Sequence, residues 1–129
     1  MAAMALVQLR YLDRDNAHRR QLAMWYDELL ADVSQVERIP IPSDCESSRH
    51  LLQVMVNNRD EVMTKMNARG IWPGMHYVAN VDYPMYAYAR GTCPRAEQAA
   101  SRLVSLPLHL RMGRTEVERV VAALVDSVK

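Results

Sequence analysis

Phenylalanine is absent from this chain of 129 residues, and only two residues are lysines. Without Phe, the core has to be filled by Leu, Val, Met and Tyr, and nine methionines are present for that role. The scarcity of lysine restricts the chemistry, because a Schiff base requires a lysine amine that can lose its proton in a partly buried pocket. Lys65 falls in a short amphipathic segment and Lys129 is the last residue, so neither is expected to be such a nucleophile.

Cysteine is also rare. Cys45 and Cys93 are far apart and match no Cys-x-x-Cys or Cys/His ligand spacing, so we expect reduced thiols rather than a disulfide or a zinc site. The spacing of Asp, Glu and His suggests no other metal site. No Gly-rich loop opens a helix, which argues against a phosphate cradle. These absences predict a chain with no metal and no cofactor site of its own.

Long apolar runs and an excess of one charge are missing too. No stretch of roughly 18 or more apolar residues exists, and the N-terminus lacks a signal-peptide pattern, so neither a membrane span nor secretion is expected. The 16 basic and 15 acidic residues nearly balance, which disfavours nucleic acid and anionic membranes as partners. The length suits a single domain, residues 1–129, and a cytoplasmic location is expected.

Helical spacing of apolar residues is clearest near the two ends of the chain. From about Ala3 to Asp32 there is no Gly or Pro and an apolar stripe recurs on one face, which predicts one long N-terminal helix. Near the other end, Thr115 and Glu118 have the spacing of a capping box. The helix that they predict carries an apolar stripe of Val117, Val120, Val121, Leu124, Val125 and Val128.

Two shorter helices are expected in the middle of the chain. The first is capped by Asn57 or Asn58 and ends at Gly70, where glycine can adopt the left-handed conformation that stops a helix. The second begins after Thr92 or Cys93. Its buried side is predicted to consist of Ala96, Ala99, Ala100 and Leu103.

Extended segments alternate with these helices. Residues 36–48 carry two prolines and then a polar run, as an edge strand or an extended segment leading into a surface loop does. Residues 49–56 are short, apolar and partly β-branched, as a central strand is, and residues 104–110 form a further extended piece. The order of elements predicts an α+β fold in which helices cover a small mixed or antiparallel sheet.

Several motifs follow one another along nearly the whole chain. They are ALVQLRYLD, RRQLAMWYDELL, NNRDEVMTKMNARGI, PGMHY with the following YPMY, CPRAEQAASRLVSLPLH and TEVERVVAALV. In this order and spacing they resemble the C-terminal small domain of the DegT/DnrJ/StrS family of pyridoxal-phosphate-dependent sugar aminotransferases. The resemblance implies the small domain of a fold-type I enzyme, entered by a long helix. It also implies that the large domain, which carries the Schiff-base lysine and most phosphate contacts, is absent.

The stretch GIWPGMHYVANVDYPMY, residues 70–86, is the best candidate for a ligand surface. Its candidate residues are His76, Tyr77, Asn80, Tyr83 and Tyr86. A histidine there could exchange a proton near neutral pH, and tyrosines could line a sugar or a nucleotide. The resemblance implies that His76 and Tyr77 lie near an active-site mouth without being catalytic. The alternative, favoured for a chain without the large domain, is a surface loop whose rings pack down with polar tips outward.

The other basic side chains carry weaker signals. His109 ends an extended segment and is interpreted as structural, whereas His18 and His50 are expected at the surface. Arg19 and Arg20 could hold a phosphate, although a solvated face is the commoner use of such a pair.

Three functions remain open. The leading one is a noncatalytic relic or accessory module of a sugar aminotransferase, which is not an enzyme on its own and meets pyridoxal phosphate (PLP) only where a partner supplies the site. The second is a protein that binds a nucleotide sugar or another small molecule. The third is a subunit that docks on a separately encoded PLP-binding large domain.

The beginning of the first predicted helix is apolar over a wider arc than one small domain would cover. Left bare, these residues would form a contiguous patch, and such patches mark interfaces. The interface candidates are Met4, Leu6, Val7, Leu9 and Leu12. We therefore expect a homo-oligomer, most simply a two-fold dimer.

Overall fold

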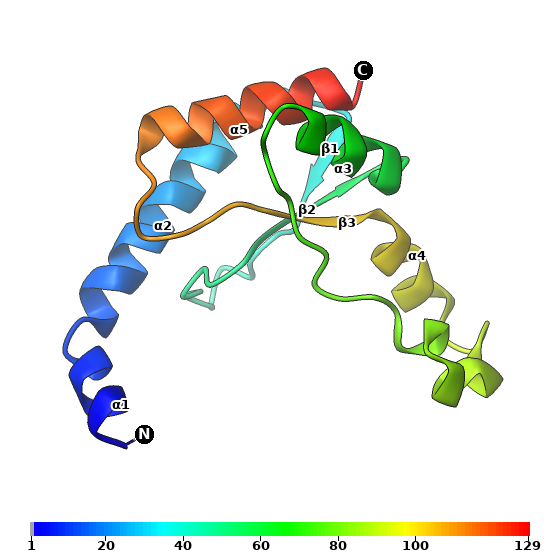
Figure 1. Cartoon of the computed structure of the whole chain (residues 1–129), viewed down its shortest axis with the longest axis horizontal. Coiled ribbons are helices and arrows are strands. Elements are labelled where there is room, and N and C mark those ends of the chain that lie inside the picture. Colours follow the sequence, from blue (N-terminus) through cyan, green and yellow to red (C-terminus); the bar gives the residue numbers. More distant parts are fainter. Residues whose placement is uncertain (1) are drawn as a thin grey trace.

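The structure of the protein is a computed structural model that describes residues 2–129. It confirms an α+β fold in which helices cover a small antiparallel sheet (Figure 1). The elements in chain order are α1 (Ala2–Leu9), α2 (Leu12–Leu29), β1 (Val36–Arg38), β2 (Leu52–Val56), α3 (Arg59–Ala68), the 3₁₀ helices η1 (Asn80–Asp82) and η2 (Pro84–Ala89), α4 (Pro94–Arg102), β3 (Leu103–Leu106) and α5 (Arg114–Ser127).

The sheet has its three strands in the order β1, β2, β3, and both neighbouring pairs are antiparallel. Along the central strand β2, Leu52, Val54 and Val56 are buried, whereas Gln53 and Met55 are only half-buried. This alternation follows from the two-residue period of a strand, which sends successive side chains to opposite faces. The predicted central strand and the predicted edge strand before the two prolines are therefore confirmed.

The core lies between the apolar face of β2 and three helices. α2 and α3 both pack against α5, and α3 also contacts β2 and β3. Leu22 of α2, Met66 of α3 and Leu124 of α5 are fully buried there. Full burial of such a side chain is worth about 1.5–3 kcal/mol. The apolar stripe predicted for α5 faces this core, with Val125 and Val128 at its partly buried margin.

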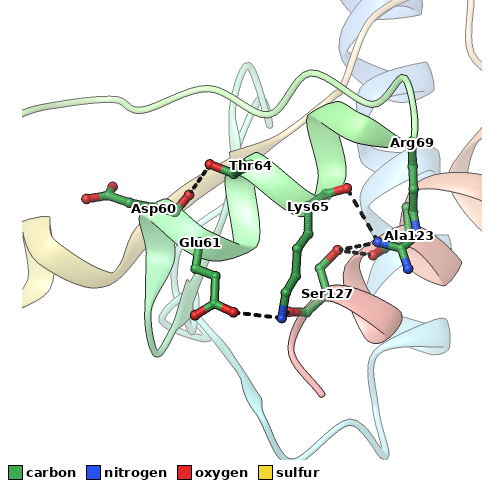
Figure 2. A network of polar contacts seen from close by, with 7 residues as sticks. All are labelled: Asp60, Glu61, Thr64, Lys65, Arg69, Ala123 and Ser127. Atoms are coloured by element: carbon green, nitrogen blue, oxygen red, sulfur yellow. Dashed lines mark hydrogen bonds and ion pairs between the residues drawn. The ribbon is translucent and has the colours of Figure 1, made fainter.

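A group of polar contacts joins α3 to the end of α5 (Figure 2). Ser127 is buried, and its hydroxyl donates to the carbonyl oxygen of Ala123 at 2.7 Å. From α3, Nη1 of Arg69 donates to the Ser127 hydroxyl at 3.4 Å, and Nζ of Lys65 lies 3.5 Å from the Ser127 carbonyl oxygen. Lys65 also pairs with Glu61 at 2.9 Å. The polar groups of Ser127 are thus satisfied although water does not reach them.

α3 ends where the sequence predicts, at Gly70, whose φ is +73°. The N–H of Gly70 donates to the Asn67 carbonyl at 2.9 Å and the N–H of Ile71 to the Met66 carbonyl at 3.1 Å, which are the two hydrogen bonds of a Schellman motif. The predicted cap at the start of α3 is wrong. Asn58 has a left-handed backbone (φ +51°), outside the extended conformation from which a side chain caps the first turn, and makes no cap hydrogen bond.

The single helix predicted over residues 3–32 is in fact two helices. Between α1 and α2, the N–H of Arg10 donates to the Val7 carbonyl at 3.2 Å and the N–H of Tyr11 to the Gln8 carbonyl at 3.0 Å. These three-residue hydrogen bonds interrupt the four-residue ladder of an α-helix. α1 has no buried residue, so no tertiary contact holds the chain in one straight helix there.

The buried alanine face predicted for α4 is also wrong. No residue of α4 is buried. Ala96 is exposed, and Ala99, Ala100 and Leu103 are only partly covered. The physical reason is that α4 projects away from the rest of the molecule (Figure 1), so its contacts with β2 leave its side chains at most partly covered.

α5 begins with a cap formed by other residues than those predicted. Gly113 precedes the helix, and its N–H donates to the Glu116 carboxylate at 2.7 Å. Glu118, predicted to form a capping box with Thr115, instead accepts a hydrogen bond from Arg114 at 3.1 Å. Glu116 takes the role because it is the third residue of the helix, from which a carboxylate reaches the N–H of the capping residue.

Two arms extend from the body toward the same side of the molecule (Figure 1). The N-terminal arm is residues 2–12, and the aromatic arm is residues 77–102, which contain η1, η2 and α4. Large apolar side chains are exposed on both arms: Met4 is 72 % exposed and Tyr88 is 84 % exposed. The core is therefore a property of the body, and the arms present apolar surface to the outside.

One buried hydrogen bond ties α2 to the segment that follows β3. The hydroxyl of Tyr26 donates to the carbonyl oxygen of Pro107 at 2.7 Å, and the Tyr26 side chain is fully buried. Burial raises the pKa of this phenol, so it stays a donor throughout the neutral range.

Tyr26→Phe is expected to lower the free energy of unfolding by about 1–2 kcal/mol, because the Pro107 carbonyl would lose its buried donor. Urea denaturation followed by circular dichroism measures the change. Tyr88→Phe is the matched control, since Tyr88 is 84 % exposed and its hydroxyl deletion should have no measurable effect. Equal stability of wild-type and Tyr26→Phe would contradict the assigned hydrogen bond.

Candidate functional site

The candidate segment crosses the free edge of the sheet just before His76. The N–H of Gly74 donates to the Ser105 carbonyl at 2.8 Å, and the N–H of Ser105 donates to the Gly74 carbonyl at 2.8 Å. Because β2 occupies the other side of β3, this exchange adds one antiparallel rung at the outer edge of the sheet. The rung fixes the backbone from which the His76 side chain projects.

The imidazole of His76 lies against the backbone of Gly74. A Cβ atom at position 74 would lie 2.6 Å from Cε1 of His76, which is closer than side-chain atoms tolerate, so glycine is what permits this approach. The His76 carbonyl accepts a hydrogen bond from Nε2 of Gln53 at 2.5 Å. The imidazole ring of His76 contacts the Tyr77 ring in an edge-on arrangement, with the two ring centroids 5.3 Å apart. The ring is therefore held by both its own backbone and its neighbours.

Two polar atoms near this rung are buried without a partner. Within residues 2–129, neither Nδ1 of His76 nor Oγ of Ser105 has a hydrogen-bond partner, and Ser105 is only 3 % exposed. An unpaired buried polar atom destabilises a fold by about 1–3 kcal/mol. Such atoms are typical of sites that a water molecule, a ligand or a neighbouring domain completes.

The other predicted ligand residues lie further along the aromatic arm. Asn80 opens η1, and Tyr83 and Tyr86 accompany η2 at the far end of the arm. Tyr83 and Tyr86 are about half exposed, whereas Tyr77 is 72 % exposed. In the described part of the chain, the His76–Tyr77 contact is the only one between aromatic rings. The structure thus pairs His76 with Tyr77 and places the other three on adjoining 3₁₀ turns, where the N–H of Tyr83 donates to the Asn80 carbonyl at 3.1 Å and the N–H of Tyr86 to the Tyr83 carbonyl at 2.9 Å.

A complete PLP site needs a lysine amine beside a phosphate cradle, and the residues present do not fit that requirement. The ammonium of Lys65 lies 2.9 Å from the Glu61 carboxylate on the same helix (Figure 2). The ammonium of Lys129 lies 2.9 Å from the carboxylate of Asp126. Both lysines line one hollow at the C-terminal end of α5, together with Ser127. Neither belongs to the segment that carries the candidate ligand residues.

The structure assembles a group of basic residues that sequence reasoning did not bring together. They line a hollow formed by Arg19, His50, Leu108, His109, Leu110 and Arg111. Three separate segments contribute, so no local spacing reveals the group. His18, expected in solvent, is partly buried beside it with Nε2 3.0 Å from the Met112 carbonyl oxygen, because α2 packs against the segment that leads into α5.

Metal and membrane chemistry have no counterpart in the described residues. Cys45 and Cys93 are exposed free thiols. Between residues 2 and 129, no three His, Cys, Asp or Glu side chains come together in a group that could hold a metal ion. No helix in the same range has the length and apolar character needed to cross a bilayer.

Comparison with known proteins relates nearly the whole chain to one family of aminotransferases. The sequence profile of the DegT/DnrJ/EryC1/StrS aminotransferase family matches residues 1–125. The dTDP-4-dehydro-2,3,6-trideoxy-D-glucose 4-aminotransferase of Saccharopolyspora spinosa is 37 % identical over 133 residues, which is 99 % of this chain and 34 % of that protein. The dTDP-3-amino-3,4,6-trideoxy-alpha-D-glucose transaminase of Streptomyces venezuelae is 33 % identical over 95 % of this chain and 34 % of its own length.

Solved structures give the same correspondence. DesV of S. venezuelae, in complex with a ketimine intermediate, matches with a TM-score of 0.92 and 32 % identity over 99 % of this chain and 36 % of its own. The aminotransferase TlmJ from Streptoalloteichus hindustanus matches with a TM-score of 0.89 and 29 % identity over 98 % of this chain and 35 % of its own. The chain therefore spans about a third of the length of the relatives it matches.

Gly74→Ala is expected to displace the imidazole of His76, because the new Cβ would lie 2.6 Å from Cε1. Overpacking of this kind destabilises a fold by roughly 1–3 kcal/mol, and the side-chain NMR resonances of His76 should shift. In a His76→Ala background the same substitution should have much less effect, because the ring is gone. An equal loss of unfolding free energy in both backgrounds would show that the ring contact is not what requires glycine.

Proposed function

Because the chain belongs to the DegT/DnrJ/EryC1/StrS aminotransferase family, we propose that residues 1–129 act as a noncatalytic accessory module of a sugar aminotransferase. The module supplies a small-domain surface, and a partner domain supplies the PLP site. One observation carries this function: nearly the whole chain matches about a third of DesV, with a TM-score of 0.92. A unit that matches so completely is suited to work beside the rest of such an enzyme.

The two lysines support a noncatalytic role for the module alone. When bound, PLP supplies the electron sink for amino transfer, and the protein must supply the amine that holds it. The Lys65 side chain is 41 % exposed and the Lys129 side chain is 67 % exposed, and both are paired with carboxylates. Neither amine lies in the enclosed, partly apolar pocket that activates a Schiff-base lysine.

The two arms support docking on a partner domain. They leave the body on the same side, so a domain seated between them would contact both (Figure 1). Their exposed apolar side chains would then be covered, which removes from water the kind of surface that usually marks an interface.

The proposed substrate class of the assembled enzyme is a nucleotide sugar. The names of the two relatives described above refer to dTDP-linked deoxysugars. In the assembled enzyme, His76 and Tyr77 would lie beside the ligand and position it, while the reacting groups would belong to the partner domain.

The proposal predicts that the purified protein does not form a specific Schiff base with PLP. After incubation with PLP and reduction with borohydride, peptide mass spectrometry should find only substoichiometric labelling, spread over the exposed amines. Lys65→Arg is the matched control and should leave the total labelling almost unchanged. Stoichiometric labelling of Lys65 or Lys129, abolished by substitution of that one residue, would contradict a noncatalytic module.

The N-terminal arm predicts that the isolated protein forms a homo-oligomer. Leu6 is 64 % exposed and Leu9 is 61 % exposed. Each is worth about 1.5–3 kcal/mol if a second copy buries it fully. Light scattering at micromolar concentration should give a dimer mass, and Leu6→Glu with Leu9→Glu should give a monomer with unchanged circular dichroism. A wild-type monomer mass would remove the homo-oligomer from the proposal, while docking on a PLP-binding domain would remain testable by co-purification.

A further inference from the structure

A basic hollow lies where α2 meets the segments before β2 and after β3. Arg19 comes from α2, His50 from the segment before β2, and His109 and Arg111 from the segment after β3. Leu108 and Leu110 complete its wall, and its volume is about 590 Å³. The lining thus contains two arginines, two histidines and two leucines, and no carboxylate.

The two guanidinium groups in this hollow are not neutralised by the chain itself. Eight other arginines form ion pairs with carboxylates, whereas within residues 2–129 neither Arg19 nor Arg111 does so. Nη1 of Arg19 donates a hydrogen bond to Oδ1 of Asn16 at 3.0 Å. An arginine has five N–H donors, so most of the donor capacity of both side chains faces the hollow or solvent.

The histidines add donors to the same place. Nδ1 of His109 accepts a hydrogen bond from the N–H of Arg111 at 3.3 Å, so the neutral ring carries its proton on Nε2 and offers it as a donor. Glu116 lies near enough to His109 for the two side chains to interact electrostatically. The pKa of Glu116 is lowered mainly by the hydrogen bond from the Gly113 N–H and to a smaller extent by His109. That carboxylate is therefore engaged at the start of α5 and is not part of the lining.

We propose that this hollow binds the phosphate group of a small soluble organic anion. Guanidinium forks match the oxygen geometry of a phosphate in a way that a single ammonium does not, and both forks here lack a carboxylate partner. Leu108 and Leu110 give an apolar wall for the organic part of the ligand, and the volume is sufficient for one small molecule. The site uses neither lysine and does not depend on the proposed function.

Isothermal titration with phenyl phosphate and with inorganic phosphate tests the site. The purified protein should bind phenyl phosphate saturably with one site per chain and more tightly than inorganic phosphate. Arg111→Gln and Arg19→Gln should each weaken binding about tenfold, and added salt should weaken it further because the charges are exposed. Arg95→Gln is the matched control, since Arg95 lies on exposed α4, outside the hollow, and forms no ion pair in the described chain.

Several outcomes would overturn the site. They are the absence of saturable binding, unchanged binding in both hollow variants that retain wild-type circular dichroism, or an equal loss in Arg95→Gln. A second experiment, with lipid vesicles, distinguishes a soluble ligand from a lipid headgroup. Cosedimentation with phosphatidic acid vesicles that is lost in Arg111→Gln, without binding of phenyl phosphate, would contradict a soluble ligand. Lys65→Arg should leave the titration unchanged, so failure here is distinct from failure of the PLP labelling prediction.

Discussion

Coverage of the apolar face of β2 is the constraint on which the rest of the structure depends. A three-stranded sheet is stable in water only if one face is buried, and here that face consists of Leu52, Val54 and Val56. The helices α2, α3 and α5 cover this face. α5 holds the three together, because α2 and α3 both pack against it. The hydrogen bond from Tyr26 to the Pro107 carbonyl then links α2 to the segment that follows β3. Once these contacts exist, the remaining segments are free to project outward.

The division between body and arms explains where function can reside. The buried core lies in the body, although Trp72 and Met24 are exposed there, whereas the large apolar side chains of the two arms are mostly exposed. The rung between Gly74 and Ser105 anchors the aromatic arm to the sheet and places His76 at its root. Exposed apolar surface is therefore extensive on the arms, while the basic hollow is formed where separate segments of the body converge.

Sequence patterns predicted those parts of the fold that are held by burial. The two-residue period of β2, the stripe of α5 and the stop at Gly70 follow from local rules that the core enforces. The continuous first helix and the buried face of α4 were wrong because no residue of α1 or α4 is buried, although α4 contacts β2 and its Ala100 carbonyl accepts a hydrogen bond from Arg59. Of the site, His76 and Tyr77 could be singled out from sequence. The Gly74 rung and the hollow that contains His50 and Arg111 could not, because their residues meet only through tertiary structure.

Hydrogen–deuterium exchange most directly tests the central claim that the aromatic arm is a docking surface on a self-contained body. The protein is measured alone and with the PLP-binding part of a relative such as the S. spinosa aminotransferase, prepared separately. The amides of β2 and α5 should be equally protected in both samples, and residues 77–102 should exchange rapidly alone and become protected only with the partner. Protection of those residues in the isolated chain, or no change when the PLP-binding part is present at saturating concentration, would contradict the claim.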